Sequence, residues 1–426
     1  MKELEERDKK LEEETNRYIV ILKTKPTRGI RATIESSELN NYGKIKYLHT
    51  IINAVTMEAI PGRGPQLASF KNPDIDKIVK DRRMKIMLDV SVPLIQVPKV
   101  WAEGKNKGRN ITIAVVDTGV DPNHPDLIGR VTKTKDFTGE GYFDGHGHGT
   151  HIAGIIAGDG KASRGKYTGI APEARIVAVK VLDSYGSGWM SDVIAGIEWA
   201  AEQGPHVMNL SLGSSGPCDG TDPTCKACDA IVDAGTTVCV AGGNSGPDPM
   251  TIGSPGCAKK VITVGASNDQ DKIASFSSRG PTSDNRVKPD VCFPGVGIVA
   301  ARGKNTSMGS PVGTHYTSAS GTSMATPHAV GISALLIRES MIKGKRVLNP
   351  FQVKDLILNH AHDLGYDNNT DGHGRGDAYK SWKEVSKEDD EPSGFRLTPL
   401  QIVLIAVAVI FIVTIIIILL LVFLNS

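Results

Sequence analysis

The stretch ARIVAVKVLDSYGSGWMSDVIAGIEWAAEQGPHVMNLSLG, residues 174–213, contains two apolar runs separated by a segment of different periodicity. The outer runs, ARIVAVKVL and HVMNLSL, are continuous and rich in β-branched residues, which is typical of strands buried on both faces. Between them, MSDVIAGIEWAAEQG has its apolar residues at helical spacing. A strand, a helix and a second strand in this order predict a parallel pair joined by a crossover helix.

The same alternation continues in both directions along the chain. Further short apolar runs are ITIAVVD (111–117), GTTVCVAGG (235–243) and KVITVGA (260–266), and GTHIAGIIAG (149–158) has helical spacing. The pattern predicts an α/β fold, in which a mainly parallel, doubly wound sheet is covered by helices on both faces.

The overall composition excludes several classes of protein. With 40% apolar and 23% charged residues, the 426-residue chain is not wholly disordered, and its length suggests two or three domains. A net charge of +2 does not point to a nucleic-acid partner, because such proteins usually concentrate positive charge on one face. Six cysteines are too few for a scaffold built on disulfides.

The C-terminus contains a long apolar segment. Residues 402–424 read IVLIAVAVIFIVTIIIILLLVFL, in which Thr414 is the only polar residue. As a helix this segment would be about 34 Å long, enough to cross a bilayer core of about 30 Å. A buried core helix is the alternative, but such helices seldom run so long without a charge. The sequence therefore predicts a single-pass tail anchor in the lipid bilayer.

The charges at the two ends of the chain predict its orientation in the membrane. The N-terminal MKELEERDKKLEEETNR is almost entirely charged and lacks the features of an export signal. The Lys and Arg residues near the apolar segment all precede it, which places the bulk of the protein on the cytoplasmic side.

These patterns divide the chain into five predicted segments. They are a charged N-terminal tail (1–17), a small α+β domain (18–90), an α/β domain (91–382), a charged juxtamembrane linker (383–399) and a transmembrane helix (400–424). At about 70 residues the α+β domain is marginal for independent stability, so we expect it to need a partner surface.

Chemically active residues follow several of the predicted strands. Asp117 ends ITIAVVD, and His148 stands at the head of the helix in DGHGHGTHIAGIIAG (144–158). Ser323 lies between a glycine turn and a helix in SASGTSMATPHAVGISALL (318–336), and Asn244 follows a strand in VCVAGGNSG (238–246). Because functional groups of open parallel sheets gather at the carboxyl ends of the strands, these residues are candidates for one site.

Each candidate also has a simpler interpretation. Asp117 could cap a turn, Ser323 could be a helix N-cap, and the glycines could serve a tight turn alone. A metal site of His146, His148 and His151 is a further alternative, but no acidic residue accompanies these histidines as in HExxH.

Three motifs in the order VVDTGVD, GHGTHIAG and GTSMATPHAVG closely resemble the subtilisin-like serine proteases, or subtilases. The resemblance extends from about residue 98 to residue 379. It implies a three-layer α/β sandwich and a serine endopeptidase that acts on polypeptides and requires no cofactor for its chemistry. The alternative is a catalytically silent, subtilase-like module that binds peptides at the membrane.

The resemblance also implies a role for each candidate residue. Ser323 matches the nucleophile, His148 matches the general base, and Asp117 matches the residue that orients the imidazole. Asn244 and the backbone N–H of Ser323 match the oxyanion hole.

Two further groups of residues match the substrate-binding segments of the family. The expected edges that pair with an extended substrate are Gly186, Ser187 and Gly188 on one side and Ser211, Leu212 and Gly213 on the other. The expected walls and floor of the P1 pocket are Ala241, Gly242, Gly243 and Gly253. Since none of them is charged, an apolar or broad P1 preference is expected.

The N-terminal α+β domain resembles the propeptide of the same family, which assists folding and inhibits the enzyme until it is cleaved. Cleavage is expected between Met84 and Pro98. The resemblance therefore predicts a self-processing zymogen whose propeptide is an intramolecular partner. After cleavage, the protease would remain attached to the membrane by its C-terminal helix.

Cysteine residues and a calcium-site motif leave alternatives open. Cys218, Cys225, Cys228 and Cys257 could form one or two disulfides, a zinc site of Cys225-x-x-Cys228 with two others, or free thiols. Many relatives bind structural calcium, and Asp126 in HPDL matches a position that commonly supplies a ligand. The lysines and arginine of GDGKASRGKYTG (158–169) disfavour a cation there.

Overall fold

The computed structural model describes residues 16–23, 29–35, 37–50, 52–81, 83–86 and 93–387. The predicted transmembrane helix (400–424), most of the linker before it and nearly all of the charged N-terminal tail lie outside these residues. In the ranges just given, no helix combines the length and the apolar character that crossing a membrane requires.

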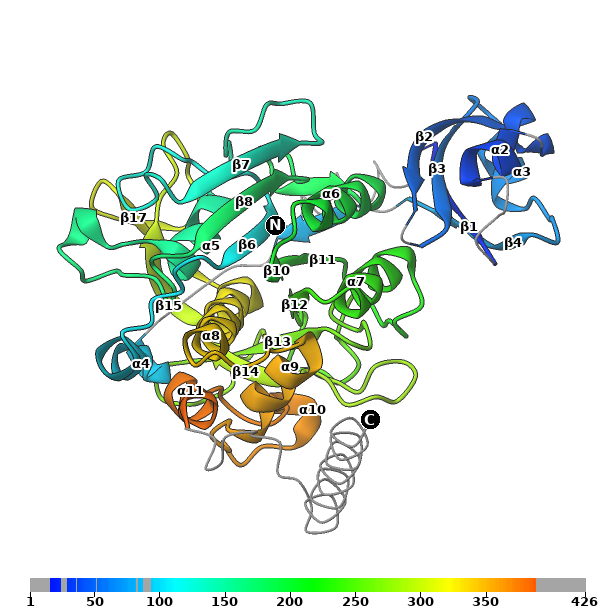
Figure 1. Ribbon diagram of the computed structural model, residues 1–426. Coiled ribbons are helices and arrows are strands. Elements are labelled where there is room, and N and C mark those ends of the chain that lie inside the picture. Colours follow the sequence, from blue (N-terminus) through cyan, green and yellow to red (C-terminus); the bar gives the residue numbers. More distant parts are fainter. Residues whose placement is uncertain are drawn as a thin grey trace, which may run out of the picture. The chain divides into compact units, whose positions relative to one another are not determined.

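A seven-stranded sheet forms the centre of the molecule (Figure 1), and every neighbouring pair of its strands is parallel. Its strands, in spatial order, are β14 (Val291–Pro294), β13 (Ile262–Ser267), β12 (Thr237–Ala241), β10 (Val207–Leu210), β6 (Thr112–Asp117), β8 (Arg175–Lys180) and β7 (Val131–Asp136). The predicted mainly parallel α/β sheet is thereby confirmed.

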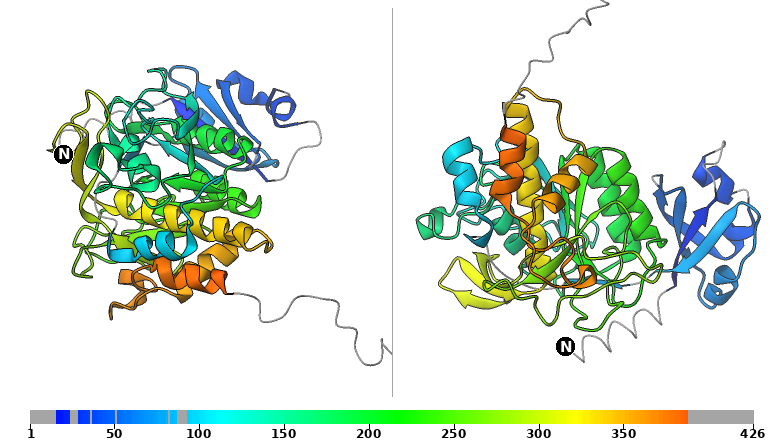
Figure 2. Two further views of the ribbon diagram at one scale, coloured as in Figure 1. Left: turned by 60° about the vertical axis from the view of Figure 1, so that its left-hand side comes forward. Right: turned by 90° about the horizontal axis from the view of Figure 1, so that it is seen from below.

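Helices cover both faces of this sheet (Figures 1 and 2). One face carries α5 (His148–Ala157) and α8 (Thr322–Ile342), and the other carries α6 (Met190–Glu202) and α7 (Pro223–Asp233). Within β6, Ile113 and Val115 belong to the core on the α5 and α8 side, while Ala114 and Val116 belong to the core on the α6 and α7 side. Burial on both sides explains why the strands read as continuous apolar runs.

Smaller elements surround the three layers. The helical ones are η2 (Pro93–Ile95), α4 (Val97–Gly104), η3 (Lys161–Ser163), α9 (Pro350–Asn359), α10 (Asn368–Asp371) and α11 (Ala378–Ser386). An antiparallel sheet contains β15 (Val296–Ala301), β17 (Tyr316–Ser320) and β16 (Ser310–Val312), and β15 contacts α5.

The N-terminal part of the chain forms a separate antiparallel sheet. Its elements are β1 (Arg17–Leu22), α2 (Ile30–Glu35), η1 (Glu38–Asn41), β2 (Gly43–His49), β3 (Ala54–Ala59), α3 (Gly64–Ala68) and β4 (Ile75–Lys80). Val20 and Met57 pack in a small core of this part, whereas Ile19 and Ile21 pack with residues of α6. The sheet therefore buries one face internally and the other against the large domain.

Candidate active site

The carboxyl edge of the parallel sheet brings Asp117 and His148 together. Asp117 is the last residue of β6, and His148 is the first residue of α5. His148 Nδ1 lies 2.7 Å from Asp117 Oδ1, and both side chains are fully buried. Asp117 Oδ1 also accepts the Thr118 N–H at 2.7 Å. A carboxylate in this position favours the tautomer with the proton on Nδ1, so that Nε2 carries the lone pair that can accept a proton.

Glycine residues allow α5 to approach the end of β6 closely. Gly147, the N-cap of α5, has φ of 106°, a left-handed conformation that favours glycine. A Cβ atom at Gly149 would collide with the carbonyl oxygen of Gly119. The glycines of the GHGHG motif thus satisfy a packing requirement that places His148 beside Asp117.

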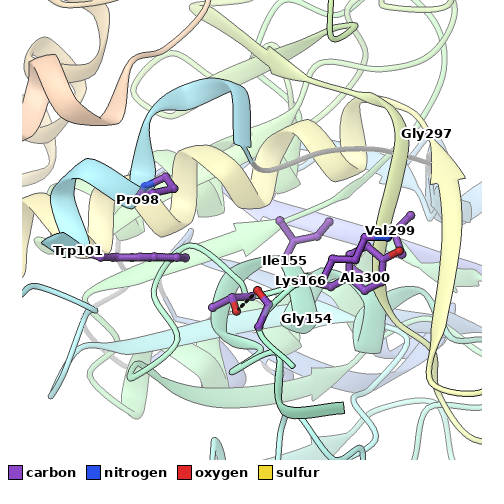
Figure 3. Close-up of a pocket in the computed structure, with 11 residues that line it drawn as sticks. Pro98, Trp101, Gly154, Ile155, Lys166, Gly297, Val299 and Ala300 are labelled. Atoms are coloured by element: carbon purple, nitrogen blue, oxygen red, sulfur yellow. Dashed lines mark hydrogen bonds between the residues drawn. The ribbon is translucent and has the colours of Figure 1, made fainter. Parts of the chain in front are cut away.

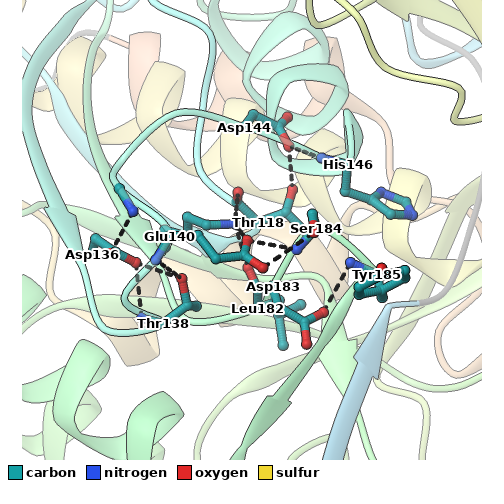
Figure 4. A network of polar contacts seen from close by, with 12 residues as sticks. Thr118, Asp136, Thr138, Glu140, Asp144, His146, Leu182, Asp183, Ser184 and Tyr185 are labelled. Carbon is teal, nitrogen blue, oxygen red and sulfur yellow. Dashed lines mark hydrogen bonds and ion pairs between the residues drawn. The ribbon is translucent and has the colours of Figure 1, made fainter.

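The loop before α5 is held by Asp144, a residue that the sequence analysis did not single out (Figure 4). Its Oδ1 accepts the Gly147 N–H at 2.7 Å and the Thr118 hydroxyl at 2.8 Å. Its Oδ2 accepts the N–H and the hydroxyl of Thr150 at 2.9 and 2.6 Å. Burial raises the pKa of Asp144, while these hydrogen bonds oppose the rise. An Asp at the start of a glycine-rich turn is the signal that could have identified it.

Ser323 lies in the first turn of α8, which packs against α5. The side chain is buried, and its hydroxyl donates to the carbonyl oxygen of Ser211 at 3.0 Å. In return, the Ser211 hydroxyl donates to the carbonyl oxygen of Ser323 at 2.7 Å. This reciprocal pair of hydrogen bonds fixes the head of α8 to the residue that follows β10. That residue, Ser211, is also the first residue of one predicted substrate edge.

Asn244 follows β12 and is held by the residue that precedes Ser323. Its Oδ1 accepts the backbone N–H of Thr322 at 2.9 Å and the Thr322 hydroxyl at 3.1 Å. Since the amide oxygen is engaged in this way, the amide nitrogen remains as the donor. Thr322 is a second residue that the sequence analysis missed, although it stands beside Ser323 in the GTSMATP motif.

The predicted substrate edges flank a strand of the chain itself. In a three-stranded antiparallel sheet, β5 (Arg83–Ile86) lies between β9 (Ser187–Trp189) and β11 (Leu212–Gly213). Backbone register pairs Met84 with Gly188 and Ile86 with Leu212. The segment at residues 83–86 therefore occupies the position that the sequence predicts for an extended polypeptide. Gly186 precedes β9 with φ of 72°.

The residues predicted for the P1 pocket lie where close backbone packing leaves no room for larger side chains. Ala241 ends β12 and is buried, and Gly243 has φ of 118°. A Cβ atom at Gly253 would collide with the carbonyl oxygen of Ser214, which follows β11. Gly242 donates its N–H to the Val264 carbonyl oxygen at 2.9 Å. All four residues are buried and uncharged, and Gly253 packs against the segment that follows β11.

The histidine metal site considered above does not form. His151 is fully buried, and its Nε2 contacts the carbonyl oxygens of Ile298 and Thr317 at 3.2 and 3.1 Å. Burial lowers the pKa of His151 to about 3 and that of His146 to about 4. Both imidazoles are therefore neutral at physiological pH, and the ring of His151 is bound to backbone groups rather than directed toward His148.

The surroundings of Asp126 do not fit a calcium ion. Its Oδ1 accepts the Ala162 N–H at 2.8 Å, and its Oδ2 accepts the Tyr316 hydroxyl at 2.6 Å. Calcium requires six to eight oxygen ligands, whereas both carboxylate oxygens of Asp126 already accept hydrogen bonds from protein N–H and O–H donors. Asp126 thus anchors the 158–169 loop by direct hydrogen bonds.

An apolar cavity of about 400 Å³ lies beside the C-terminal half of α5 (Figure 3). Trp101 and Pro98 of α4, Ile155 of α5 and Val299 of β15 line it. None of the residues predicted to act in catalysis or substrate binding belongs to its lining. The cavity is therefore distinct from the edge at which Asp117 and His148 meet.

Comparisons with known proteins agree with this geometry. The model of the Subtilase family matches residues 108–376 of the chain. Serine protease AprX of Bacillus subtilis (strain 168) is 39% identical over 356 residues, which cover 78% of this chain and 79% of that protein. Subtilisin DY of Bacillus licheniformis is 38% identical over 278 residues, which cover 64% of this chain and 91% of that protein.

The fold also matches a solved structure. Fervidolysin from Fervidobacterium pennivorans, described as a keratinolytic enzyme related to subtilisin, matches with a TM-score of 0.68. The match covers 86% of this chain and 61% of that chain at 24% sequence identity, so it concerns the fold alone.

Proposed function

The chain belongs to the subtilase family and is a serine endopeptidase, and we propose that Asp117, His148 and Ser323 carry out its catalysis. The observation that carries the proposal is the 2.7 Å contact between His148 Nδ1 and Asp117 Oδ1, which is buried at the carboxyl edge of the sheet. Ser323, at the head of the neighbouring helix α8, supplies the hydroxyl.

In this mechanism the Ser323 hydroxyl attacks the scissile carbonyl while His148 Nε2 accepts its proton. The imidazolium then returns the proton to the leaving amine, and a water molecule hydrolyses the acyl-enzyme by the same two steps. Asp117 stabilises the imidazolium through the bond at Nδ1. The Asn244 amide and the Ser323 N–H would donate to the developing oxyanion, and the engagement of Asn244 Oδ1 by Thr322 supports that assignment.

Labelling with a fluorophosphonate probe tests the nucleophile. We expect the probe to modify one residue, Ser323, because only a hydroxyl activated by a general base reacts readily with it. Peptide mass spectrometry after digestion identifies the modified residue. An enzyme that hydrolyses peptides but is labelled at another serine, or not at all, would contradict the proposed nucleophile.

We also propose that the N-terminal part acts as an inhibitory propeptide and that the chain is a self-processing zymogen. The position of β5 between β9 and β11 supports this, because a strand bound in that place excludes a substrate strand. Arg17 and Asp81 add polar contacts at the start of α6. Arg17 lies 3.1 Å from Asp192, and Asp81 accepts the Ser191 N–H at 3.0 Å.

Binding of the cleaved propeptide to the processed enzyme should weaken as pH rises from about 4 to about 6. Burial raises the pKa of Asp81 from 3.8 to about 6 in the docked state, so docking favours the protonated carboxyl. The complex binds more protons than its separated parts, and its stability falls until the docked carboxyl has lost its proton. At tenfold per pKa unit, the dissociation constant should rise by up to about 100-fold.

Titration of the cleaved fragment against the processed enzyme at several pH values, followed by fluorescence anisotropy, measures this effect. Asp81→Asn should remove most of the change between pH 4 and 6. An unchanged pH dependence in Asp81→Asn would show that Asp81 is not responsible.

We propose further that residues 402–424 anchor the protease in a membrane, with the catalytic domain on the cytoplasmic side. The uninterrupted apolar run and the basic residues that precede it support this localisation.

The uncharged residues Ala241, Gly242, Gly243 and Gly253 support an apolar or broad P1 preference among polypeptide substrates.

A further inference from the structure

Four potential metal ligands converge outside the catalytic site, between the segment that follows β11 and the turn after Gly253. They are the thiols of Cys218, Cys225 and Cys257 and the carboxylate of Asp222. One donor atom from each lies within 4.8 Å of the others. Cys225 and Cys257 are fully buried, and 8% of Asp222 is exposed. The chain thus gathers three sulfur atoms and one oxygen in a largely dry place.

Three of the distances between these atoms are close to the edges of a tetrahedral site. With zinc–sulfur bonds of about 2.3 Å and zinc–oxygen bonds of about 2.1 Å, the edges of a tetrahedron are about 3.8 Å between sulfurs and about 3.6 Å between sulfur and oxygen. The sulfur of Cys225 lies 3.9 Å from that of Cys218 and 3.4 Å from that of Cys257. The sulfur of Cys218 lies 3.5 Å from Asp222 Oδ2. In this structure Cys218 and Cys257 are joined as a disulfide, the oxidised state of the same cluster.

The surroundings orient the ligands. Asp222 is the N-cap of α7, and its Oδ1 accepts the N–H groups of Thr224 and Cys225 at 2.9 and 3.2 Å, which leaves Oδ2 on the side of Cys218. Cys225 lies in the first turn of α7, three residues after Asp222, so both ligands are presented by the N-terminus of the same helix. The hydroxyl of Ser254 lies 3.5 Å from the Cys225 sulfur. Such outer contacts are typical of sites that hold a metal.

A cation also compensates for the charge that such a site would carry. Three thiolates and a carboxylate leave a net charge of about −2 after Zn²⁺ binds. Arg286 Nη2 donates to the carbonyl oxygens of Asp219 and Cys257 at 3.0 and 2.8 Å, so its guanidinium lies beside both segments that supply ligands. Lys77 donates to the Thr221 carbonyl oxygen at 2.7 Å.

We propose that, in its reduced form, this chain binds one zinc ion through Cys218, Cys225, Cys257 and Asp222. Three cysteine sulfurs with one carboxylate favour zinc over calcium or magnesium, and four protein ligands make the site structural rather than catalytic. Each thiol that binds the ion releases its proton to solvent. Where the disulfide has formed, two molecules of a low-molecular-weight thiol reduce it to two thiols and become a disulfide themselves.

Cys228, which the sequence analysis paired with Cys225, does not belong to the cluster. It is buried on α7 as a free thiol, and no contact joins its sulfur to the four ligands among the described residues. The ion would instead tie the N-terminus of α7 to the turn at Ser254. The carbonyl oxygen of Ser254 accepts the Ser214 N–H at 2.8 Å. The site would therefore also stabilise the segment that follows β11.

Metal analysis of the purified, untagged protein tests the proposal. The wild-type chain, reduced without oxygen and then dialysed against Zn²⁺ and metal-free buffer, should contain about one zinc per chain by plasma mass spectrometry. Cys225→Ser should lose at least nine-tenths of the zinc, whereas Cys228→Ser, a buried thiol on the same helix, should retain it. Replacement of zinc by Co²⁺ should give the sulfur-to-metal charge-transfer band of a tetrahedral thiolate site in the wild type and in Cys228→Ser.

Measurements on the wild type alone keep the test decisive if Cys225→Ser folds poorly. Removal of zinc by a chelator under reducing conditions should lower the melting temperature, and zinc, but not calcium, should restore it. A reduced wild type that takes up no zinc, or a Cys225→Ser variant that binds a full equivalent, would overturn the proposal. If the reduced wild type takes up no zinc, these residues form only the Cys218–Cys257 disulfide with the Cys225 thiol beside it.

Discussion

Replacement of Ser323 by alanine is expected to lower kcat by about 10⁶-fold, the loss known for the equivalent change in subtilisin. The neighbouring hydroxyl at the head of α8 belongs to Thr322, and it donates to Asn244 Oδ1. We therefore do not expect it to replace the Ser323 hydroxyl as the nucleophile. The fold should survive, because the hydrogen bond that the Ser323 hydroxyl donates to the Ser211 carbonyl at 3.0 Å is worth about 1 kcal/mol, a small part of the stability of a domain this size. Hydrolysis of a fluorogenic peptide measures the effect.

Ser333→Ala is the matched control for this substitution. Ser333 is buried on the same helix and donates to the Ala329 carbonyl oxygen at 2.7 Å, so it loses a comparable hydrogen bond away from the site. Its kcat should stay within about twofold of the wild type. A Ser323→Ala enzyme with more than about 1% of the wild-type rate would show that another group is the nucleophile.

The same variant separates catalysis from processing. Purified Ser323→Ala should remain a full-length chain of 45.5 kDa, because no active enzyme is present to cut between the propeptide and the catalytic domain. Appearance of the shorter form in a host that lacks other proteases would contradict self-processing. It would leave the assignment of the nucleophile unaffected, since activity is measured independently.

The central sheet was predictable because its strands are buried on both faces. Strands such as β6 and β8 then read as unbroken apolar runs, and the helices between them repeat at a different period. The edge strand β7, with the sequence VTKTKD, was not identified. Its residues are partly exposed, so burial does not impose an apolar run on them.

The candidate site was predictable to a smaller extent. Residues at strand ends were expected to meet, and Asp117 and His148 do so across 31 positions of sequence. Asp144 and Thr322 were missed because their importance comes from hydrogen bonds to partners 26 and 78 residues away. The glycine-rich turn after Asp144 indicates a turn-capping role, but no local pattern marks these long-range contacts, since Asp and Thr are common in turns for reasons that involve only their own backbone.

The location of β5 was beyond sequence reasoning for a similar reason. A short run such as RMKI fits an extended strand, but its partners, β9 and β11, lie more than 100 residues further along the chain. Pairing at that distance depends on the shape of two edges that exist only after the large domain has folded. The sequence placed the cleavage region near this segment only through the resemblance to a family.

Replacement of Asp117 by asparagine should lower kcat by about 10⁴-fold, as removal of the corresponding charge does in related mechanisms. Asp117 Oδ1 accepts two N–H donors, those of His148 Nδ1 and Thr118. If the asparagine oxygen keeps both contacts, a buried NH₂ replaces Oδ2, which has no hydrogen-bond partner in the part of the chain that the structure describes. If the amide turns over, its NH₂ faces the Thr118 N–H and donates to Nδ1, which removes the proton acceptor at Nε2. Neither orientation supplies the negative charge that stabilises an imidazolium.

Asp136→Asn provides the matched control, because Asp136 also ends a strand at the carboxyl edge of the sheet. Among the residues that the structure describes, its carboxylate accepts hydrogen bonds from its own turn alone, for example from the Thr138 and Gly141 N–H groups at 2.8 and 2.9 Å. Kinetics should show kcat and KM within about threefold of the wild type for Asp136→Asn. For Asp117→Asn, KM should stay similar while kcat falls, since the fully buried Asp117 carboxylate contacts His148 and is shielded from solvent. A loss confined to KM would mean that Asp117 shapes the binding cleft, and the proposed orientation of His148 by its charge would then be wrong.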